Sequence, residues 1–355
     1  MNSPARPAAI GPMNVLAILG ALFLLSAPWS LPLVVNEFWV TVLAEILIWS
    51  LFATSVNILF GYTGLLSFGQ ALYFGMGAYG VALGIDMFGL SFWPAFLLGL
   101  AAGTLTAAIA GIFAVRLTWH YFAIITIVFS LIFYFWAVGW KDVTGGDDGL
   151  PFSVPPVFKA GGLELTVLDL TFQYYFILVI VGACYWLLRV ILKSPLGFAF
   201  MAIRENDSRA SLIGLNPYQI RYISFVLAGF YAGMAGVLFA VFSRYASAGN
   251  LFWTVSGEGV IWTIIGGAGT LIGPGIGAAL LIVIREELSV YWEHYLLIVG
   301  VLVIVVVTFM PQGVMGLLQR RLGGTRPTAW ADTKTLPDSG RENEDLDRES
   351  TSSSG

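Results

Sequence analysis

The chain has 355 residues, of which 58% are hydrophobic and only 11% are charged, with a formal net charge of −4. Soluble proteins carry roughly 25% charged residues, so a chain of this size with so few charges cannot cover a soluble surface. The composition therefore excludes a soluble enzyme, a nucleic-acid-binding protein and a disordered protein, and it indicates a polytopic membrane protein. The charges are also uneven, since residues 320–355 hold 13 of the 38 charged residues.

A helix needs roughly 20 apolar residues to cross a bilayer, and the sequence predicts an all-α fold of about ten transmembrane helices. The predicted spans are residues 12–34, 39–60, 64–84, 92–115, 119–139, 172–192, 222–243, 258–268, 272–290 and 294–311. A re-entrant loop near 266–273 is the alternative to two separate spans there. Residues 1–321 then form the transmembrane domain, and the polar residues 322–355 form a disordered tail.

Lys and Arg residues predict the orientation, because they concentrate on the cytoplasmic side of a membrane. With both termini cytoplasmic, 13 of the 17 Lys and Arg residues fall on the inner side, and four, including Arg285, fall on the outer side. Nine spans would instead place Arg320 and Arg321 outside. The bias favours ten spans, with a long outer loop at about 140–171 and a long inner loop at about 193–221.

Two segments are too rich in glycine for uniform helices: GYTGLLSFGQALYFGMGAYG at 61–80 and GGAGTLIGPGIG at 266–277. Irregular backbone at membrane depth is tolerated only against protein or a water-filled cavity. We therefore expect broken helices there, which in the two halves of a transporter mark the translocation path. Plain helix packing is the alternative. The candidate path residues are Ser67, Gly69, Gln70, Gly75, Gly266, Gly267, Gly269, Thr270 and Gly273.

Small residues also recur at every fourth position in two other spans, at Gly99 and Gly103 and at Gly229 and Gly233. Helices in lipid lack a hydrophobic drive to associate, and small residues let their backbones approach closely. This pattern predicts a tightly packed bundle.

Charged residues inside the predicted spans are few. Glu45 lies in the second span and Glu258 opens the eighth, so each is a candidate functional group unless it lies near the membrane surface. The scarcity of buried ionisable groups argues against a proton-coupled carrier or an ion pump. The two histidines, His120 and His294, fall at opposite faces, and Cys184 is the single cysteine. The sequence therefore predicts no catalytic residues, no metal site and no cofactor.

Several stretches, in order, resemble one family. They are GYTGLLSFGQALYFGMGAYGVAL at 61–83, SPLGFAFMAIRENDSRASLIGLNPYQIRYISFVLAGFYAGMAG at 194–236, GEGVIWTIIGGAGTLIGPGIG at 257–277 and PQGVMGLLQRR at 311–321. The chain resembles the branched-chain amino acid ABC transporter permeases, M-type subunit, from about residue 40 to residue 321. One departure is Gln70, where many family members carry histidine.

The resemblance implies a permease subunit without catalysis of its own, in the bacterial plasma (inner) membrane. The partners that the resemblance implies are a sister permease, two cytoplasmic ATPase subunits and an extracytoplasmic substrate-binding protein. The chain has no GxxxxGK[ST] phosphate-binding loop, so ATP chemistry would reside in a partner. The expected substrates are branched-chain amino acids, with urea or short amides as the alternative in the same family. A stand-alone secondary carrier is the alternative from a different class.

The resemblance also places contact with an ATPase in the inner loop. Residues 204–215 suit a short helix at the membrane surface, with Gly214 as its C-terminal stop. Glu205, Ala210 and Gly214 resemble the E…A…G pattern of importer permease loops. The alternative is a basic loop that serves only topology. The predicted coupling residues are Arg204, Glu205, Asn206, Asp207, Arg209, Ala210 and Gly214.

Overall fold

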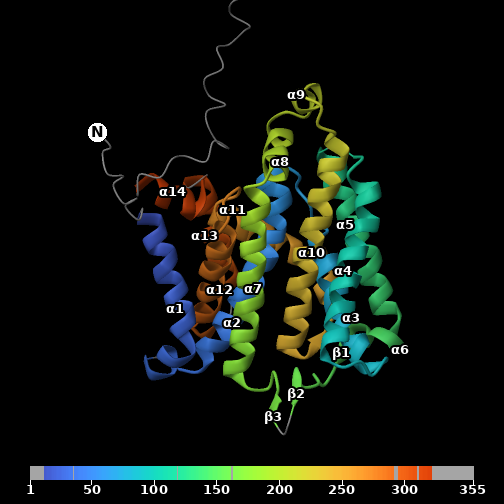
Figure 1. Cartoon of the computed structure of the whole chain (residues 1–355), viewed down its shortest axis with the longest axis vertical. Coiled ribbons are helices and arrows are strands. Elements are labelled where there is room, and N and C mark those ends of the chain that lie inside the picture. Colours follow the sequence, from blue (N-terminus) through green and yellow to red (C-terminus); the bar gives the residue numbers. More distant parts are fainter. Residues whose placement is uncertain are drawn as a thin grey trace, which may run out of the picture. The chain divides into compact units, whose positions relative to one another are not determined.

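The computed structural model describes residues 12–34, 36–117, 119–160, 163–291, 295–309 and 312–321. Most of these residues are helical (Figure 1). The predicted disordered tail at 322–355 lies outside the described residues, so the boundary between the two predicted domains stays a prediction.

Ten helices of 14 residues or more lie within the described residues, and each overlaps one predicted span. They are α1 (Pro12–Val34), α2 (Phe38–Asn57), α3 (Gln70–Asp86), α4 (Phe92–Ala114), α5 (Trp119–Gly139), α7 (Leu170–Leu192), α10 (Pro217–Ser243), α11 (Trp253–Gly266), α12 (Gly273–Tyr291) and α13 (Tyr295–Phe309). Five stretches of the described residues are long and apolar enough to cross a membrane: 38–63, 92–114, 120–139, 170–192 and 217–243. The chain is a multi-pass membrane protein, whereas ten crossings stay a prediction.

Short elements connect these helices. They are η1 (Ile58–Thr63, a π-helix), α6 (Lys141–Thr144), η2 (Gly146–Asp148), α8 (Pro195–Glu205), α9 (Asp207–Leu212), η3 (Ala248–Leu251) and α14 (Gly313–Arg321). In Figure 1, α8, α9 and α14 lie at one end of the long helices, and α6 lies at the other end. The long loops predicted at about 140–171 and 193–221 therefore occupy opposite ends.

Four short strands add to the predicted helical fold. β1 (Leu150–Pro151) pairs antiparallel with β4 (Tyr245–Ala246), and β2 (Phe158–Ala160) pairs antiparallel with β3 (Leu163–Leu165). All but β4 lie in the loop predicted at 140–171. Backbone groups that leave a helix need new hydrogen-bond partners, and pairing of short extended segments supplies them.

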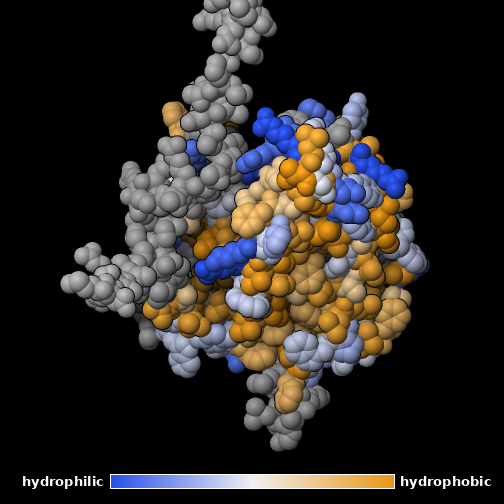
Figure 2. Space-filling view, turned by 45° about the horizontal axis from the view of Figure 1, so that its top comes forward, coloured by the Kyte–Doolittle hydropathy of each residue, from blue (hydrophilic) through white to orange (hydrophobic). Residues whose placement is uncertain are grey.

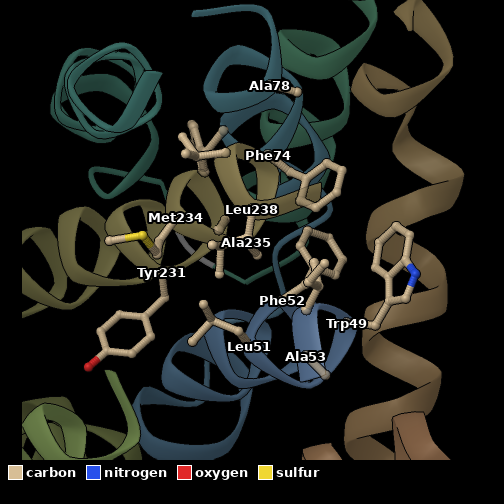
Figure 3. Packing of buried hydrophobic residues seen from close by; sticks show 14 of the residues in the cluster. Trp49, Leu51, Phe52, Ala53, Phe74, Ala78, Tyr231, Met234, Ala235 and Leu238 are labelled. Atoms are coloured by element: carbon tan, nitrogen blue, oxygen red, sulfur yellow. The ribbon is translucent and has the colours of Figure 1, made fainter. Parts of the chain in front are cut away.

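The centre of the membrane part is built from α2, α3, α4 and α10, with α10 packed against the other three. Aromatic side chains fill the space between α2, α3 and α11 (Figure 3). Trp49 stacks on Phe74 with ring centroids 5.1 Å apart, and Phe52 meets the same Phe74 ring edge-on at 5.1 Å. Trp262 of α11 approaches Trp49 at 5.3 Å.

The small-residue pattern of α4 and α10 brings their backbones together, as predicted. A methyl group added at Gly103 of α4 would lie 2.8 Å from Cα of Gly233 in α10. A methyl group at Gly99 would lie 2.5 Å from the Val81 side chain of α3. No larger residue fits these positions without moving a helix, which agrees with glycine as the means of close packing in lipid.

Both predicted helix interruptions are present, and the first is shorter than its glycine content suggested. The first break covers residues 64–69, between η1 and α3, and the second break covers residues 267–272, between α11 and α12. Residues 70–80 form regular α-helix, because their glycines face neighbouring helices at close range. Glycine content alone could not distinguish glycines that interrupt a helix from glycines that pack against a neighbouring helix.

Candidate functional site

The predicted coupling loop folds into two short helices. Asn206 follows α8 and ends this helix, because its backbone is extended, with φ −164° and ψ 111°. Its side chain then accepts a hydrogen bond from the Arg209 N–H at 2.9 Å, which caps α9. Gly214 follows α9 with φ +90°, where a side chain would strain the backbone. The single helix predicted at 204–215 is therefore wrong, because the Asn206 side chain begins a new helix.

One side of α9 is anchored and its end is exposed. Ala210 is buried in a small apolar cluster with residues of α8 and α10. The Asp207 carboxylate forms an ion pair with Arg221 near the start of α10. Leu212 and Ile213 are 86% and 75% exposed, so two aliphatic side chains project from the loop. Figure 2 shows hydrophilic residues gathered at this end of the molecule, in contrast to its mostly hydrophobic sides.

Arg204, the last basic residue of α8, reaches from the loop to the first break. Its Nη1 donates a hydrogen bond to the Gly61 carbonyl, and its side chain packs against Gly64. The same guanidinium lies beside Gly269 of the second break, where an added methyl group would be 3.1 Å from Nη1. Burial lowers the pKa of the Arg204 guanidinium, because a buried charge loses hydration. One side chain of the loop thus lies against both breaks.

Asn57, the last residue of α2, ties the second break to the end of α2, next to η1. Its Nδ2 donates a hydrogen bond to the Thr270 carbonyl at 2.8 Å, and its Oδ1 accepts one from the Gly269 N–H at 2.8 Å. Asn57 is completely buried. Its amide satisfies both a donor and an acceptor of irregular backbone, which a buried break requires.

A pocket of about 280 Å³ lies between the α8–α9 loop and the first break. It is lined by Thr63, Gly64, Leu65, Ile203, Arg204, Glu205, Asn206, Asp207 and Arg221. Four of the seven predicted coupling residues thus border this space. The α8–α9 loop and the first break are not fully packed against each other here, so the loop has room to shift relative to the break.

Predicted path residues of the first break lie in a polar, buried setting at the start of α3. The Gly69 N–H donates to Ser67 Oγ at 3.2 Å, and the N–H of Ala71, the second residue of α3, donates to Ser256 Oγ of α11 at 2.8 Å. Gln70 is completely buried, with its Oε1 3.5 Å from Ser55 Oγ of α2. The start of α3 is therefore held by hydroxyl groups from neighbouring helices.

The remaining predicted path residues are placed differently from one another. Gly75 lies within α3 against Leu251 of η3, and Gly266 and Gly273 lie against each other where α11 turns into α12. Gly267 has φ +115°, which only glycine adopts readily. The Thr270 hydroxyl accepts a hydrogen bond from the Gly273 N–H at 3.2 Å at the start of α12. The two breaks meet at the α8–α9 end, whereas Gly75 lies farther along α3.

The contact between Gly266 and Gly273 leads to a stability prediction. A methyl group in Gly266→Ala would overlap the Gly273 carbonyl oxygen, which is backbone and cannot rotate away. We expect overpacking to lower the free energy of unfolding by about 1–3 kcal/mol, measured by thermal denaturation in detergent. Gly257→Ala in the same helix is the matched control, because no atom lies within 4 Å of its added methyl group. Equal stability of the two variants would contradict the packing described.

The family described as "Branched-chain amino acid transport system / permease component" matches residues 38–307 of this chain. The chain belongs to this permease family. The match extends from the start of α2 into α13, so it includes both breaks and the α8–α9 loop. The resemblance drawn from the sequence motifs is confirmed.

Individual relatives agree with the family. The permease is 28% identical over 327 residues to the high-affinity branched-chain amino acid transport system permease protein LivM of Escherichia coli (strain K12), which covers 86% of this chain and 76% of the relative. It is 26% identical over 323 residues to LivM of Salmonella typhimurium, with the same coverage. It is 28% identical over 246 residues, 64% of this chain and 68% of the relative, to the autoinducer 2 import system permease protein LsrC of Enterobacter sp.. No solved structure matched the chain.

Sequence analysis missed Asn57, Ser256 and Thr126, whose side chains hold the permease's breaks. The Thr126 hydroxyl accepts a hydrogen bond from the Phe68 N–H at 3.1 Å. A lone amide in an otherwise apolar span was a signal for Asn57, since such a group needs partners. The hydroxyl groups of Ser256 and Thr126 gave no comparable signal in the sequence. In the part of the chain that the structure describes, no group of three His, Cys, Asp or Glu residues is placed to hold a metal ion.

Proposed function

We propose that this permease forms, with a sister permease, the translocation path of an ATP-driven importer for branched-chain aliphatic amino acids. Two relatives are named as permeases of high-affinity branched-chain amino acid transport systems. The observation that carries the proposal is the contact of Arg204, in the α8–α9 loop, with Gly61 and Gly269. A partner that moves this loop would move both helix breaks together.

The proposed partners are two cytoplasmic ATPase subunits, which supply the energy, and an extracytoplasmic binding protein, which delivers the substrate. The short α9 helix, with exposed Leu212 and Ile213, is the segment proposed to enter a cleft of an ATPase subunit. Exposed Glu205 precedes α9 and exposed Arg209 lies within it, and both can orient the contact. An apolar tip within a charged rim is the usual anatomy of a protein interface.

The proposed topology has ten crossings, with the α8–α9 loop and both termini in the cytoplasm of a bacterial cell. Helices α3, α11 and α13 are short for a full crossing, at 17, 14 and 15 residues. The irregular segments 64–69 and 244–252 precede α3 and α11 and complete these two crossings. Residues 1–321 form the membrane domain in this proposal, and residues 322–355 form a tail.

The proposed path runs beside the first break. Ser67, Gly69 and Gln70 surround the start of α3, where the helix N-terminus carries a partial positive charge. Broken helices of transporters present such N-termini to anionic groups of their substrates. The second break, through Gly267, Gly269 and Thr270, is proposed to move with it because the Arg204 side chain lies against both Gly64 and Gly269.

Uptake measurements test the function. Cells that depend on this permease should accumulate labelled leucine, isoleucine or valine, and uptake should stop when ATP is depleted while the ion gradient is kept. Uptake that stops only with loss of the ion gradient would contradict the proposal and indicate a secondary carrier. Accumulation of urea or short amides in place of these amino acids would contradict the substrate assignment alone.

A charge on the exposed tip of α9 should abolish transport without unfolding the permease. In Leu212→Asp, the aspartate would have to lose its hydration to enter an apolar contact, and we expect uptake to fall by at least about tenfold. Stability should stay within about 0.5 kcal/mol of the parent, since Leu212 is 86% exposed. Leu212→Met, which keeps the apolar contact, is the matched control. Normal uptake by Leu212→Asp would remove α9 from the ATPase interface.

A further inference from the structure

Charged side chains meet inside the helical region. Arg285 of α12 has its Nη2 3.0 Å from Glu45 Oε1 of α2 and 3.0 Å from Glu286 Oε1. The same Glu45 oxygen accepts a hydrogen bond from Trp49 Nε1 at 3.0 Å. Glu258 of α11 lies within electrostatic reach of Arg285. The sequence analysis counted Arg285 with the charges of the outer side although it lies in the predicted span 272–290, and the structure places it within α12.

These groups lie within two helices that cross the membrane in the proposed topology. Glu258 comes five residues after the start of α11, and Arg285 comes six residues before the end of α12. At 1.5 Å per residue, they lie about 8 Å and about 9 Å from the helix ends opposite the second break. In that topology α11 and α12 cross a hydrocarbon core about 30 Å thick, and both positions fall inside the half of it that is farther from the second break. Glu258 is not at the start of its span, as the sequence suggested, because α11 begins at Trp253.

The cluster is not enclosed by its own chain. Glu258 is exposed, and the side chains of Arg285 and Glu45 are 35% and 22% exposed. Charged side chains in transmembrane segments face protein or a water-filled cavity rather than lipid. Two carboxylates, of Glu45 and Glu286, contact one guanidinium, and the carboxylate of Glu258 interacts with it electrostatically. A protein surface that covered this face would bury excess negative charge, which is costly without a new cation.

We propose that the face of α11 and α12 that carries Glu258 and Arg285, together with Glu45, borders water and forms one wall of the translocation path. Water solvates the excess negative charge without a counter-charge from a partner. The inference rests on the proposed transport function and adds a wall that sequence analysis did not include among the path residues. The glycines Gly266 and Gly273 then serve to hold α11 against α12.

Cysteine labelling tests the wall directly. The chain has a single cysteine, Cys184, which is buried, so the parent gives a low background. Glu258→Cys and Glu45→Cys are made in the complete transporter in native membranes. They are treated from both sides with a charged, membrane-impermeant methanethiosulfonate reagent, which needs a hydrated thiolate. Asp86→Cys, at the exposed end of α3, sets the rate for a thiol in water.

Two exposed, lipid-facing positions serve as controls. Leu105→Cys in α4 and Val179→Cys in α7 replace side chains that are 61% and 68% exposed near the middle of apolar spans. We expect both test variants to react within about tenfold of the Asp86→Cys rate, and both controls to react at least about 100-fold more slowly, because lipid excludes the thiolate.

The result that would overturn the proposal is labelling of Glu258→Cys and Glu45→Cys as slow as that of the two controls, since lipid or a sister permease would then cover this face. Labelling does not require transport, so the outcome is separate from the uptake test of the proposed function. Slow labelling in membranes that still take up leucine would overturn only the proposal that this face forms a wall of the translocation path. Fast labelling in membranes without uptake of any amino acid would overturn only the substrate and function assignment.

Discussion

Replacing Asn57 with leucine is expected to lower the free energy of unfolding of the permease by about 2–6 kcal/mol. Leucine fills a similar volume, but it can neither donate a hydrogen bond to the Thr270 carbonyl nor accept one from the Gly269 N–H. Both backbone groups would then stay buried without partners, and each unmet group costs about 1–3 kcal/mol. Chemical denaturation of the detergent-solubilised transporter, followed by tryptophan fluorescence, measures the loss.

Asn250→Leu provides the matched control for this substitution. The Asn250 side chain is also asparagine, but its buried Nδ2 has no hydrogen-bond partner among the described residues. Its replacement removes an unmet donor, so stability should stay the same or rise. If Asn57→Leu proved as stable as Asn250→Leu, Asn57 would not hold the second break against α2.

The helix breaks could be predicted because glycine leaves a local signal. Gly267 has φ +115°, a conformation that no residue type other than glycine adopts readily. The extent of the first break could not be predicted in the same way. Gly75 and Gly77 sit in regular helix and are needed for close approach to η3 and α10. Composition cannot distinguish a glycine that bends its own helix from one that admits a neighbour.

The contacts that join the site could not be predicted, because they connect residues far apart in the chain. Asn57 and Thr270 are separated by 213 positions, and Arg204 and Gly61 by 143 positions. Motifs placed Arg204 in the coupling loop and Gly61 in the first glycine-rich segment, but gave no reason to connect them. Only the folded chain brings α8 beside the end of η1. The same holds for Glu45 and Arg285, which sequence analysis assigned to different places.

Arg204→Met should uncouple the α8–α9 loop from the helix breaks while leaving the permease in the membrane. Methionine keeps most of the aliphatic stem that packs on Gly64 and removes the hydrogen bond to the Gly61 carbonyl. A coupling free energy of about 1–3 kcal/mol between two sites corresponds to about a 5- to 150-fold effect. We therefore expect uptake to fall by that factor, because movement of the loop would no longer be passed to the breaks.

The decisive readout for Arg204→Met is ATP hydrolysis measured beside uptake in the same reconstituted transporter. An uncoupled permease still binds its ATPase subunits, so hydrolysis should continue while uptake falls. Arg189→Met is the matched control, because Arg189 is an exposed arginine in the last turn of α7, close in the chain to the same loop. It removes the same charge without touching either break, and its uptake should equal that of the parent. A parallel loss of hydrolysis and uptake in Arg204→Met would instead mean that Arg204 holds the loop in shape for ATPase binding, and the route from α8 to the breaks through Gly61 would be wrong.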